Sequence, residues 1–388
     1  MMGFLRADLT AEEAAFLDGA AAFAENTVRP NADEWERARR QPVEALREAA
    51  ALGLLRLETP KEQGGLGHRY LVKLALCEEM SRADMAFAFS LVNTQNVAAR
   101  LAVSPSARHR ESHVPALMSG ALFGATALSE PGAGSDFSAI RTSAEKVEGG
   151  WRLNGEKGWI TNAGIAGLFI TYVQTDASAG WRGIACFLVD ARREGFARGE
   201  AYALMGGHAI GAGGFVLRDY FAPDDDMLAP PGEAFKLAMK GVNGARVYVA
   251  AMCAGLLASA LETALGYAAG REAFGKSLLE HQGLNWSLGD VANDLEALRG
   301  LVAHAGGLID RGEEAVMAAA HAKKFAGRVT LPRLADCIQA MGANGLREEH
   351  GLHRHVACAK VAAYTDGSTE MMNERIGAGL LKSYGPVK

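Results

Sequence analysis

The sequence predicts an α+β protein of three units: an N-terminal helical domain (residues 1–120), a middle β-domain (121–228) and a C-terminal bundle of the four-helix type (229–388). Three observations predict this order. Apolar residues recur at helical spacing in the first unit, and short segments rich in β-branched and aromatic residues follow. A helical pattern from Glu233 to Gly270 is then long enough to belong to a bundle.

The first unit contains recognisable helix ends. Thr10 and Glu13 have the spacing of a capping box, in which each side chain accepts from a main-chain amide of the first turn. Pro42 can open a later helix and Gly53 can close it. Further helical patterns cover residues 70–82, 85–101 and 106–119.

In the second unit, Asn154-Gly155 separates two β-type segments, 151–154 and 157–160, which predicts a hairpin at that dipeptide. Strands are also expected at 168–174 and 183–190. Pro223, the acidic run 224–226 and Pro230-Pro231 mark the boundary to the third unit. The other helices of the bundle are expected near residues 278–308, 313–341 and 369–380.

Charge and cysteine content exclude several protein classes. The formal net charge of −5 disfavours nucleic acid and anionic membranes as partners. No apolar run approaches the roughly 20 residues of a membrane span, and Met1 to Thr10 has no apolar signal core. The five cysteines are scattered, without a Cys-x-x-Cys pair, so we expect buried thiols in a cytoplasmic protein, and neither disulfides nor a metal site.

A glycine-rich segment, A-L-S-E-P-G-A-G-S-D at 127–136, is the most informative local pattern. A strand ends there in a polar turn whose small residues let main-chain amides approach an anion, with Ser129 and Ser135 as hydroxyl donors. The other glycine-rich stretch, 206–214, does not open a helix after a strand, so a Rossmann-type nucleotide site is not expected.

The segment at 127–136 resembles the first signature of the acyl-CoA dehydrogenase family and fits it at every defined position through Ala139. Three further segments resemble family motifs in the family's order. They are W-I-T-N at 159–162, R-E-A-F-G-K at 271–276 with His281-Gln282, and Q-A-M-G-A-N-G at 339–345. The likeness covers nearly the whole chain and implies FAD as cofactor.

The resemblance also implies roles for individual residues. Trp159 would shield one face of the isoalloxazine, Thr161 would bond near its reactive N5 edge, and Arg271 and Phe274 would hold the adenine half. Gln282 would reach a neighbouring subunit's cofactor, which implies a homo-oligomer, either a dimer or a tetramer. The implied FAD-binding set is Thr126, Leu128, Ser129, Gly134, Ser135, Trp159, Thr161, Arg271, Phe274, Gln282, Gln339, Gly342, Ala343, Gly367, Ser368 and Glu370.

The chemistry that the family performs needs a base beside Cα of an acyl thioester, and a hydride acceptor, flavin N5, beside Cβ. In the family pattern Y-E-G-T the glutamate is the base. This chain has Y-T-D-G-S-T-E at 364–370, which implies Asp366, a side chain shorter by about 1.5 Å. Ser135, Asn243 and Arg246 match positions that contact the CoA substrate, and an electron-transfer flavoprotein would accept the electrons.

Alternatives remain at this point. Nitroalkane oxidases also use an Asp base but pair it with an Arg seven residues later, where this chain has Asn373. A flavin oxidase or monooxygenase, or a non-catalytic flavin-binding relative, therefore stays open, as do the acyl chain and the choice between CoA and an acyl carrier protein.

Two further features have competing interpretations. Asp84 is a second candidate base, although a helix cap is the favoured interpretation. His350, His353 and His355 are interpreted as a solvated cluster at a helix end, in preference to a metal site.

Overall fold

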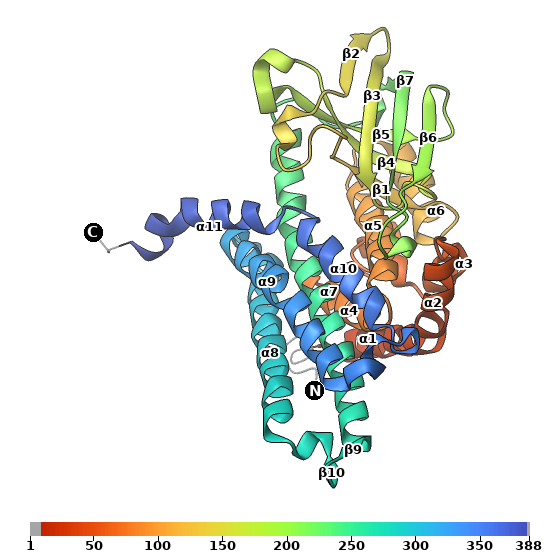
Figure 1. The fold of residues 1–388 in the computed structure, drawn as a ribbon. Coiled ribbons are helices and arrows are strands. Elements are labelled where there is room, and N and C mark those ends of the chain that lie inside the picture. The colour runs from red at the N-terminus through yellow and green to blue at the C-terminus, as the bar shows by residue number, and fades with distance from the viewer. Residues whose placement is uncertain (1–8, 386–388) are drawn as a thin grey trace.

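The computed structural model describes residues 9–385 and confirms the predicted order of helices, strands and helices (Figure 1). Helices extend to Met118, strands lie between Gly124 and Ala229, and helices resume at Ala234. The β-domain forms one end of the molecule, and the two helical parts pack against each other below it (Figure 1). The expected lack of a signal core concerns mainly residues 1–8, which lie outside the described range.

The N-terminal helices begin and end close to their predicted positions. Glu13 N donates to Thr10 Oγ1 (3.2 Å) and Thr10 N donates to Glu13 Oε2 (2.8 Å), which confirms the capping box. Gly53, with φ +80°, follows the helix that Pro42 precedes. The helices are α1 (Ala11–Phe23), a π-helical turn (Ala24–Val28), α2 (Arg29–Ala38), α3 (Val43–Ala51), α4 (Tyr70–Ala83), α5 (Met85–Ala102) and α6 (Val114–Met118).

The β-domain is built around one sheet of eight strands within the described chain. Its order is β6-β7-β3-β2-β4-β5-β8, and β1 pairs in parallel with β4. Strands β4 and β5 are buried along their whole length, as their apolar composition predicts. The strands are β1 (Gly124–Ala127), β2 (Ser143–Val147), β3 (Gly150–Ile160), β4 (Leu168–Gln174), β5 (Ile184–Asp190), β6 (Phe196–Ala201), β7 (Gly213–Pro223) and β8 (Met227–Ala229).

The predicted hairpin at Asn154-Gly155 is wrong, because β3 runs through that dipeptide without turning. The turn lies earlier, at Glu148-Gly149, where Gly149 has φ +71° and Val147 pairs with Gly150. Gly155 instead marks an irregularity in the pairing of β3 with β7, and a Cβ there would approach Thr142 Cα within 2.6 Å. Both dipeptides have turn chemistry, so long-range pairing with β7 decides which one turns.

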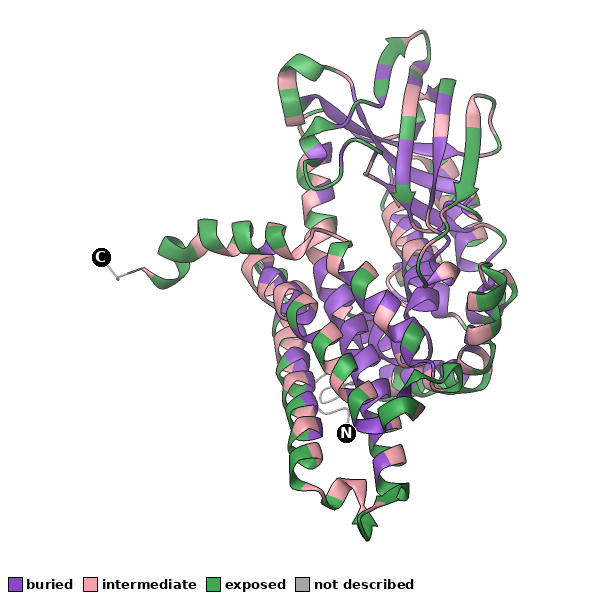
Figure 2. Ribbon diagram, viewed as in Figure 1, coloured by how far each residue is buried: buried purple, intermediate pink, exposed green. Residues whose placement is uncertain are grey.

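The C-terminal part consists of α7 (Ala234–Gly270), a short hairpin of β9 (Glu272–Ala273) and β10 (Lys276–Ser277), α8 (Gln282–Asp310), α9 (Val316–Met341), α10 (Leu352–Tyr364) and α11 (Thr369–Tyr384). Helix α10 was not among the expected helices. Helix α7 is long and apolar enough to cross a membrane, so the expectation that no apolar stretch approaches that length is wrong. Of its most apolar window, 78% is buried inside the protein, so packing in the core explains the apolar composition (Figure 2).

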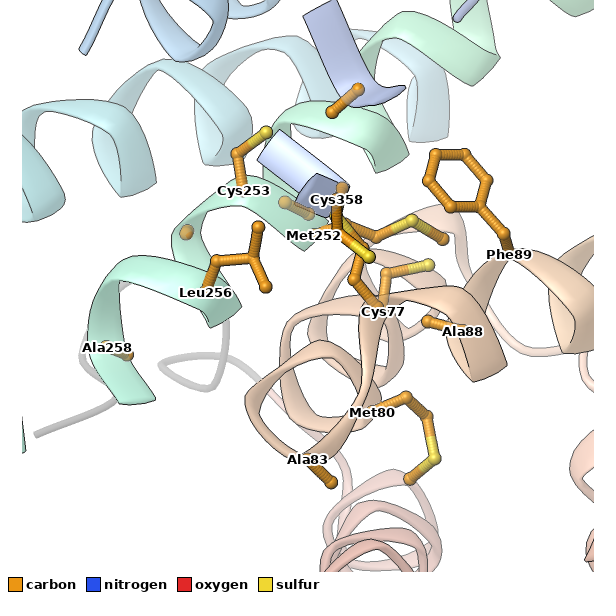
Figure 3. Packing of buried hydrophobic residues seen from close by; sticks show 14 of the residues in the cluster. Cys77, Met80, Ala83, Ala88, Phe89, Met252, Cys253, Leu256, Ala258 and Cys358 are labelled. Atoms are coloured by element: carbon orange, nitrogen blue, oxygen red, sulfur yellow. The ribbon is translucent and has the colours of Figure 1, made fainter. Parts of the chain in front are cut away.

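The main core lies where α4, α5, α7 and α10 meet. Figure 3 shows Cys77 of α4, Met252 of α7 and Cys358 of α10 close together in this core. All five cysteines are free and buried, which confirms the expected thiols. Small residues dominate α7, and Gly255 lies so near α4 that a Cβ would approach Glu78 O within 2.3 Å. Close helix packing therefore joins the first unit to the bundle.

Candidate active site

Asp366 lies in the four-residue connection between α10 and α11. Its main chain has φ +57°, a left-handed conformation that is unfavourable for most residues other than glycine, and Gly367 follows with φ +104°. Thr365 N donates to Val361 O (3.1 Å) to end α10, and Ser368 caps α11 by accepting from Met371 N (3.4 Å). The end of α10 and the start of α11 thus hold Asp366 in this left-handed conformation.

Two cations from different helices lie beside this turn. Arg246 of α7 is buried, and its Nε donates to the main-chain oxygen of Asp366 (3.1 Å) while its Nη1 donates to Asn243 Oδ1 (2.7 Å). Lys323 of α9 is also buried and donates to Gly367 O (3.3 Å). Arg246 therefore contacts the turn of Asp366 directly, and Asn243 is connected to that turn through Arg246. The resemblance assigned both residues to the thioester carrier.

The environment of Asp366 makes its carboxyl a weaker acid than usual. Burial raises the pKa from 3.8 to about 6, although Lys323 and Arg246 act in the opposite direction. Asp366 as a whole is half-buried, so the turn that holds it remains accessible from solvent. A carboxylate of this pKa is ionised at neutral pH and is more basic than an ordinary aspartate, which suits it to accept a proton from carbon.

The glycine-rich loop after β1 is held by a buried ion pair. Glu130 accepts from Lys157 Nζ (2.9 Å) and from the main-chain amides of Arg141 (2.7 Å) and Thr142 (2.9 Å). Burial lowers the pKa of Lys157 to about 8, and Glu130 opposes that shift. Lys157 also donates to Leu128 O (3.1 Å). Strand β3 therefore holds the loop at both of these points.

Trp159, at the end of β3, has φ +60° and exposes 62% of its surface. Its ring lies 4.7 Å from that of Tyr202, and Gly158 N just before it donates to Ser129 O (3.1 Å) in the glycine-rich loop. Asn162, which follows this turn, connects it to α5 and β1, because its Nδ2 donates to Ser90 O (2.8 Å) and Gly124 O (3.1 Å). An exposed indole in a strained main-chain conformation is typical of a ligand-binding position.

These features fit the FAD that the sequence resemblance implies. The indole of Trp159 offers a flat apolar surface for an aromatic ring system. At Gly132 and Gly134 nothing lies within 4 Å of where a Cβ would stand, so the loop is open to an approaching group. Ser129 and Ser135 lie on the same loop, while Thr126, Leu128 and Thr161 are partly exposed beside it.

A second group of implied FAD contacts lies far from this loop. Arg271, Phe274 and Gln282 belong to the β9–β10 hairpin and the start of α8, at the opposite end of the bundle from the β-domain (Figure 1). Helix α7, which separates the two ends, is about 55 Å long at 1.5 Å per residue. Phe274 is 97% exposed with φ +55°. One chain therefore does not bring this group to its own glycine-rich loop.

The third implied segment, Gln339, Gly342 and Ala343, lies at the end of α9 and is exposed. It is separated from Lys323, and so from the Asp366 turn, by about 25 Å along the helix. Gly342 has φ +59° and an open surface. Gly367, Ser368 and Glu370 lie next to Asp366 instead. The implied cofactor contacts of one chain therefore do not gather at a single place.

Asp84 has a structural role, which confirms the favoured interpretation. Its side chain accepts from Phe87 N (2.7 Å) as the N-cap of α5 and from Arg354 Nη1 (2.8 Å), and it is buried. The interpretation of the histidines as a solvated cluster is wrong for His355, which is buried in α10, where burial lowers its pKa to about 3. Within residues 9–385 no three metal-binding side chains gather at one place.

Sequence reasoning missed Lys323, Glu130 and Lys157 as parts of this region. The sequence contains a signal for Lys323, since a charged residue on a helix face made of Ala319, Ala322 and Ala326 must have a buried partner. Its partners are main-chain oxygens of a segment about 40 residues later. No local pattern identifies them.

Comparisons with known proteins agree with the observed fold. The family models described as acyl-CoA dehydrogenase N-terminal, middle and C-terminal domains match residues 10–121, 125–220 and 232–381. An acyl-CoA dehydrogenase of Bacillus subtilis is 31% identical over 92% of this chain and 95% of that protein.

Solved structures agree as well. Butyryl-CoA dehydrogenase from Megasphaera elsdenii superposes with a TM-score of 0.92 at 31% identity, covering 96% of this chain and 99% of that one. The FAD complex of PigA superposes with a TM-score of 0.90 at 26% identity, covering 96% of this chain and 98% of that one.

Proposed function

Because the chain belongs to the acyl-CoA dehydrogenase family, we propose that it oxidises the Cα–Cβ bond of an acyl-CoA thioester with bound FAD and that Asp366 is the base. The observation that carries this proposal is the turn at Asp366. A carboxyl with a pKa of about 6 lies there in a strained conformation between two buried cations. Strain that costs stability is expected where a side chain must meet a substrate.

In this mechanism the Asp366 carboxylate removes a proton from Cα of the thioester. The main-chain N–H of Asp366 donates to the thioester carbonyl oxygen and stabilises the negative charge that develops there. Arg246 donates to the main-chain oxygen of Asp366. This contact helps to position the residue that supplies both the carboxylate base and the N–H donor. When bound, FAD supplies the two-electron acceptor for the bond that is oxidised.

The residues that would hold FAD belong to two subunits. Trp159, Thr161 and the loop with Ser129 and Ser135 would contact one part of the cofactor, because the exposed indole follows Gly158, whose N–H donates to Ser129 O in that loop. The second group, at the other end of the bundle, would contact the cofactor of another copy of this chain. That group is Arg271, Phe274, Gln282, Gln339, Gly342 and Ala343. This division supports a homo-oligomer, and we propose a tetramer.

The substrate and acceptor follow from the relatives. Since a solved relative is named as a butyryl-CoA dehydrogenase, butyryl-CoA is the first substrate to test. Ser135, Asn243 and Arg246 remain the proposed contacts to the carrier, and an electron-transfer flavoprotein is the proposed acceptor. We also propose that the domain boundaries lie near residues 120 and 228. The proposed location of the protein is the cytoplasm.

The deciding experiment is anaerobic mixing of the FAD-loaded protein with butyryl-CoA and other acyl-CoA thioesters while the flavin absorbance is recorded. We expect bleaching by at least one short thioester. Asp366→Asn should retain FAD but lose bleaching rate by about 10²- to 10⁴-fold, the usual contribution of a general base. Asp84→Asn, with FAD bound, is the matched control and should bleach at a rate close to that of the unmodified protein.

The same samples discriminate between the alternative functions. If air reoxidises the reduced enzyme–product complex rapidly, the protein is an oxidase or monooxygenase. If no thioester bleaches the flavin, the non-catalytic interpretation is favoured. Near-normal bleaching by Asp366→Asn would remove this residue as the base.

A further inference from the structure

Lys323 is a buried cation that the proposed reaction does not use directly. It lies in the middle of α9, exposes 2% of its surface and is surrounded on its helix by alanines. Burial lowers its pKa. A lysine ammonium in such a place is costly unless its three donors are satisfied, so its partners indicate why it is there.

Both hydrogen-bond partners of Lys323 within the described residues are main-chain oxygens on the two sides of Asp366. Its Nζ donates to Ala362 O (2.7 Å) in the last turn of α10 and to Gly367 O (3.3 Å) just after Asp366. Ala362 O is one of the carbonyl groups that the end of a helix leaves without a helical partner, and a cation is favourable at that end. One ammonium therefore joins the end of α10 to the residue that follows the base.

The turn needs such a contact because its conformation is strained. Asp366 has φ +57° and Gly367 has φ +104°, and a strained segment persists only when its surroundings impose it. Arg246 holds the turn from the α7 side through the main-chain oxygen of Asp366. Lys323 holds it from the α9 side. Without Lys323 the span from residue 362 to 367 loses the contact that connects its two ends.

We propose that Lys323 is a positioning residue for Asp366, which it keeps in reach of the substrate by joining Ala362 O to Gly367 O. This inference rests on the proposed function, since it assigns Lys323 a task in the reaction of Asp366. The charge of Lys323 adds a second effect. It favours the ionised form of Asp366 and so acts against burial.

Other groups that influence Asp366 are Arg246 and Tyr248 of α7 and Tyr70 of α4, in addition to Lys323 of α9. Burial holds the pKa of both tyrosines well above 10, so they stay neutral near pH 6 to 8. Arg246 keeps its charge throughout this range. A change in the titration of Asp366 upon loss of the Lys323 ammonium therefore reports on Lys323 itself.

The first test is the pH dependence of anaerobic flavin bleaching by butyryl-CoA in Lys323→Met, which keeps the aliphatic stem and removes the ammonium. We expect the acid limb of the rate profile to move up by about one pH unit, because an opposite charge close by lowers a carboxyl pKa by that order. The maximal rate should fall by about 10- to 100-fold through misplacement of the base.

Two further variants make the result interpretable. Lys323→Arg keeps the charge and should keep the acid limb within a few tenths of a pH unit. Lys324→Met changes the adjacent lysine of α9 and should leave the profile unchanged. An unshifted limb in Lys323→Met, or an equal shift in Lys323→Arg, would overturn the proposal.

A second test needs no substrate and so separates this inference from the proposed function. The Tm of the flavin-loaded protein is measured for Lys323→Met, Asp366→Asn and the double variant at pH 5 and pH 8. If Lys323 serves the ionised Asp366, its loss lowers the Tm at pH 8 less in the Asp366→Asn background than in the unmodified protein. At pH 5 the two losses should be alike. If Lys323→Met lowers the Tm equally in the two backgrounds at pH 8 as well as at pH 5, the proposal is wrong, whatever the activity of the variants.

Discussion

Replacing Asp366 by Asn should stabilise the protein at neutral pH while it greatly slows proton removal from the substrate. The physical reason is the raised pKa. Burial disfavours the carboxylate, so the folded protein holds a proton on Asp366 up to about pH 6, whereas the unfolded chain releases it near 3.8. The stabilising contribution of that proton is present below pH 4 and is lost as the pH rises through 6. Asn has no charge to bury and loses nothing.

The size of the effect follows from the shift. A difference of about 2 pKa units corresponds to about 3 kcal/mol at about 1.4 kcal/mol per unit. Asp366 retains partial solvent contact, which screens the effect, so a gain of about 2 kcal/mol is the working expectation. For a chain of this size that corresponds to a Tm about 3 °C higher at pH 8 than that of the unmodified protein. At pH 4 the two proteins should differ little.

The assay is thermal unfolding of both flavin-loaded proteins at matched scan rates from pH 4 to pH 8. Glu13→Gln is the control with the opposite sign, because the hydrogen bond from Arg69 lowers the pKa of that carboxyl to about 2, so its loss should lower the Tm at neutral pH. A Tm difference between Asp366→Asn and the unmodified protein that does not grow from pH 4 to pH 8 would refute the reasoning.

The remaining predictions concern the flavin site and the assembly. The bleaching rate of the unmodified protein should fall about tenfold per pH unit below pH 6 and level off above it, as stopped-flow absorbance at several pH values would reveal. Glu130→Gln leaves the Lys157 ammonium without its counter-charge, so unfolding should require about 3 kcal/mol less and FAD should dissociate more readily, with Glu145→Gln on exposed β2 as the unaffected control. Phe274→Ala removes a side chain with little contact in its own chain, so each subunit should fold normally; weaker FAD binding and a smaller assembly by light scattering are expected, and an unchanged FAD-loaded tetramer would contradict the shared site. Finally, Trp159→Ala should weaken FAD retention measured by ultrafiltration without lowering the Tm of the FAD-free protein, because the indole is mostly exposed.

The sequence by itself determined the order of structural units and the region of the chemistry. Periodicity located α4, α7 and β4 almost to the residue, because each buries a face that its apolar pattern defines. Motif order pointed to the acyl-CoA dehydrogenase family and to Asp366. These features are local in the sequence and can therefore be recognised in a single chain.

Only the tertiary structure decided which contacts act on these residues. Pairing of β3 with β7 placed the turn at Gly149 and not at Gly155, although both dipeptides suit a turn. Lys323 and Arg246 contact the turn of Asp366 through main-chain oxygens, which have no signature in the sequence. Burial gave Asp366 its basicity, and burial depends on how α7, α9 and α10 pack. A residue type can be recognised locally, but its pKa is a property of its surroundings.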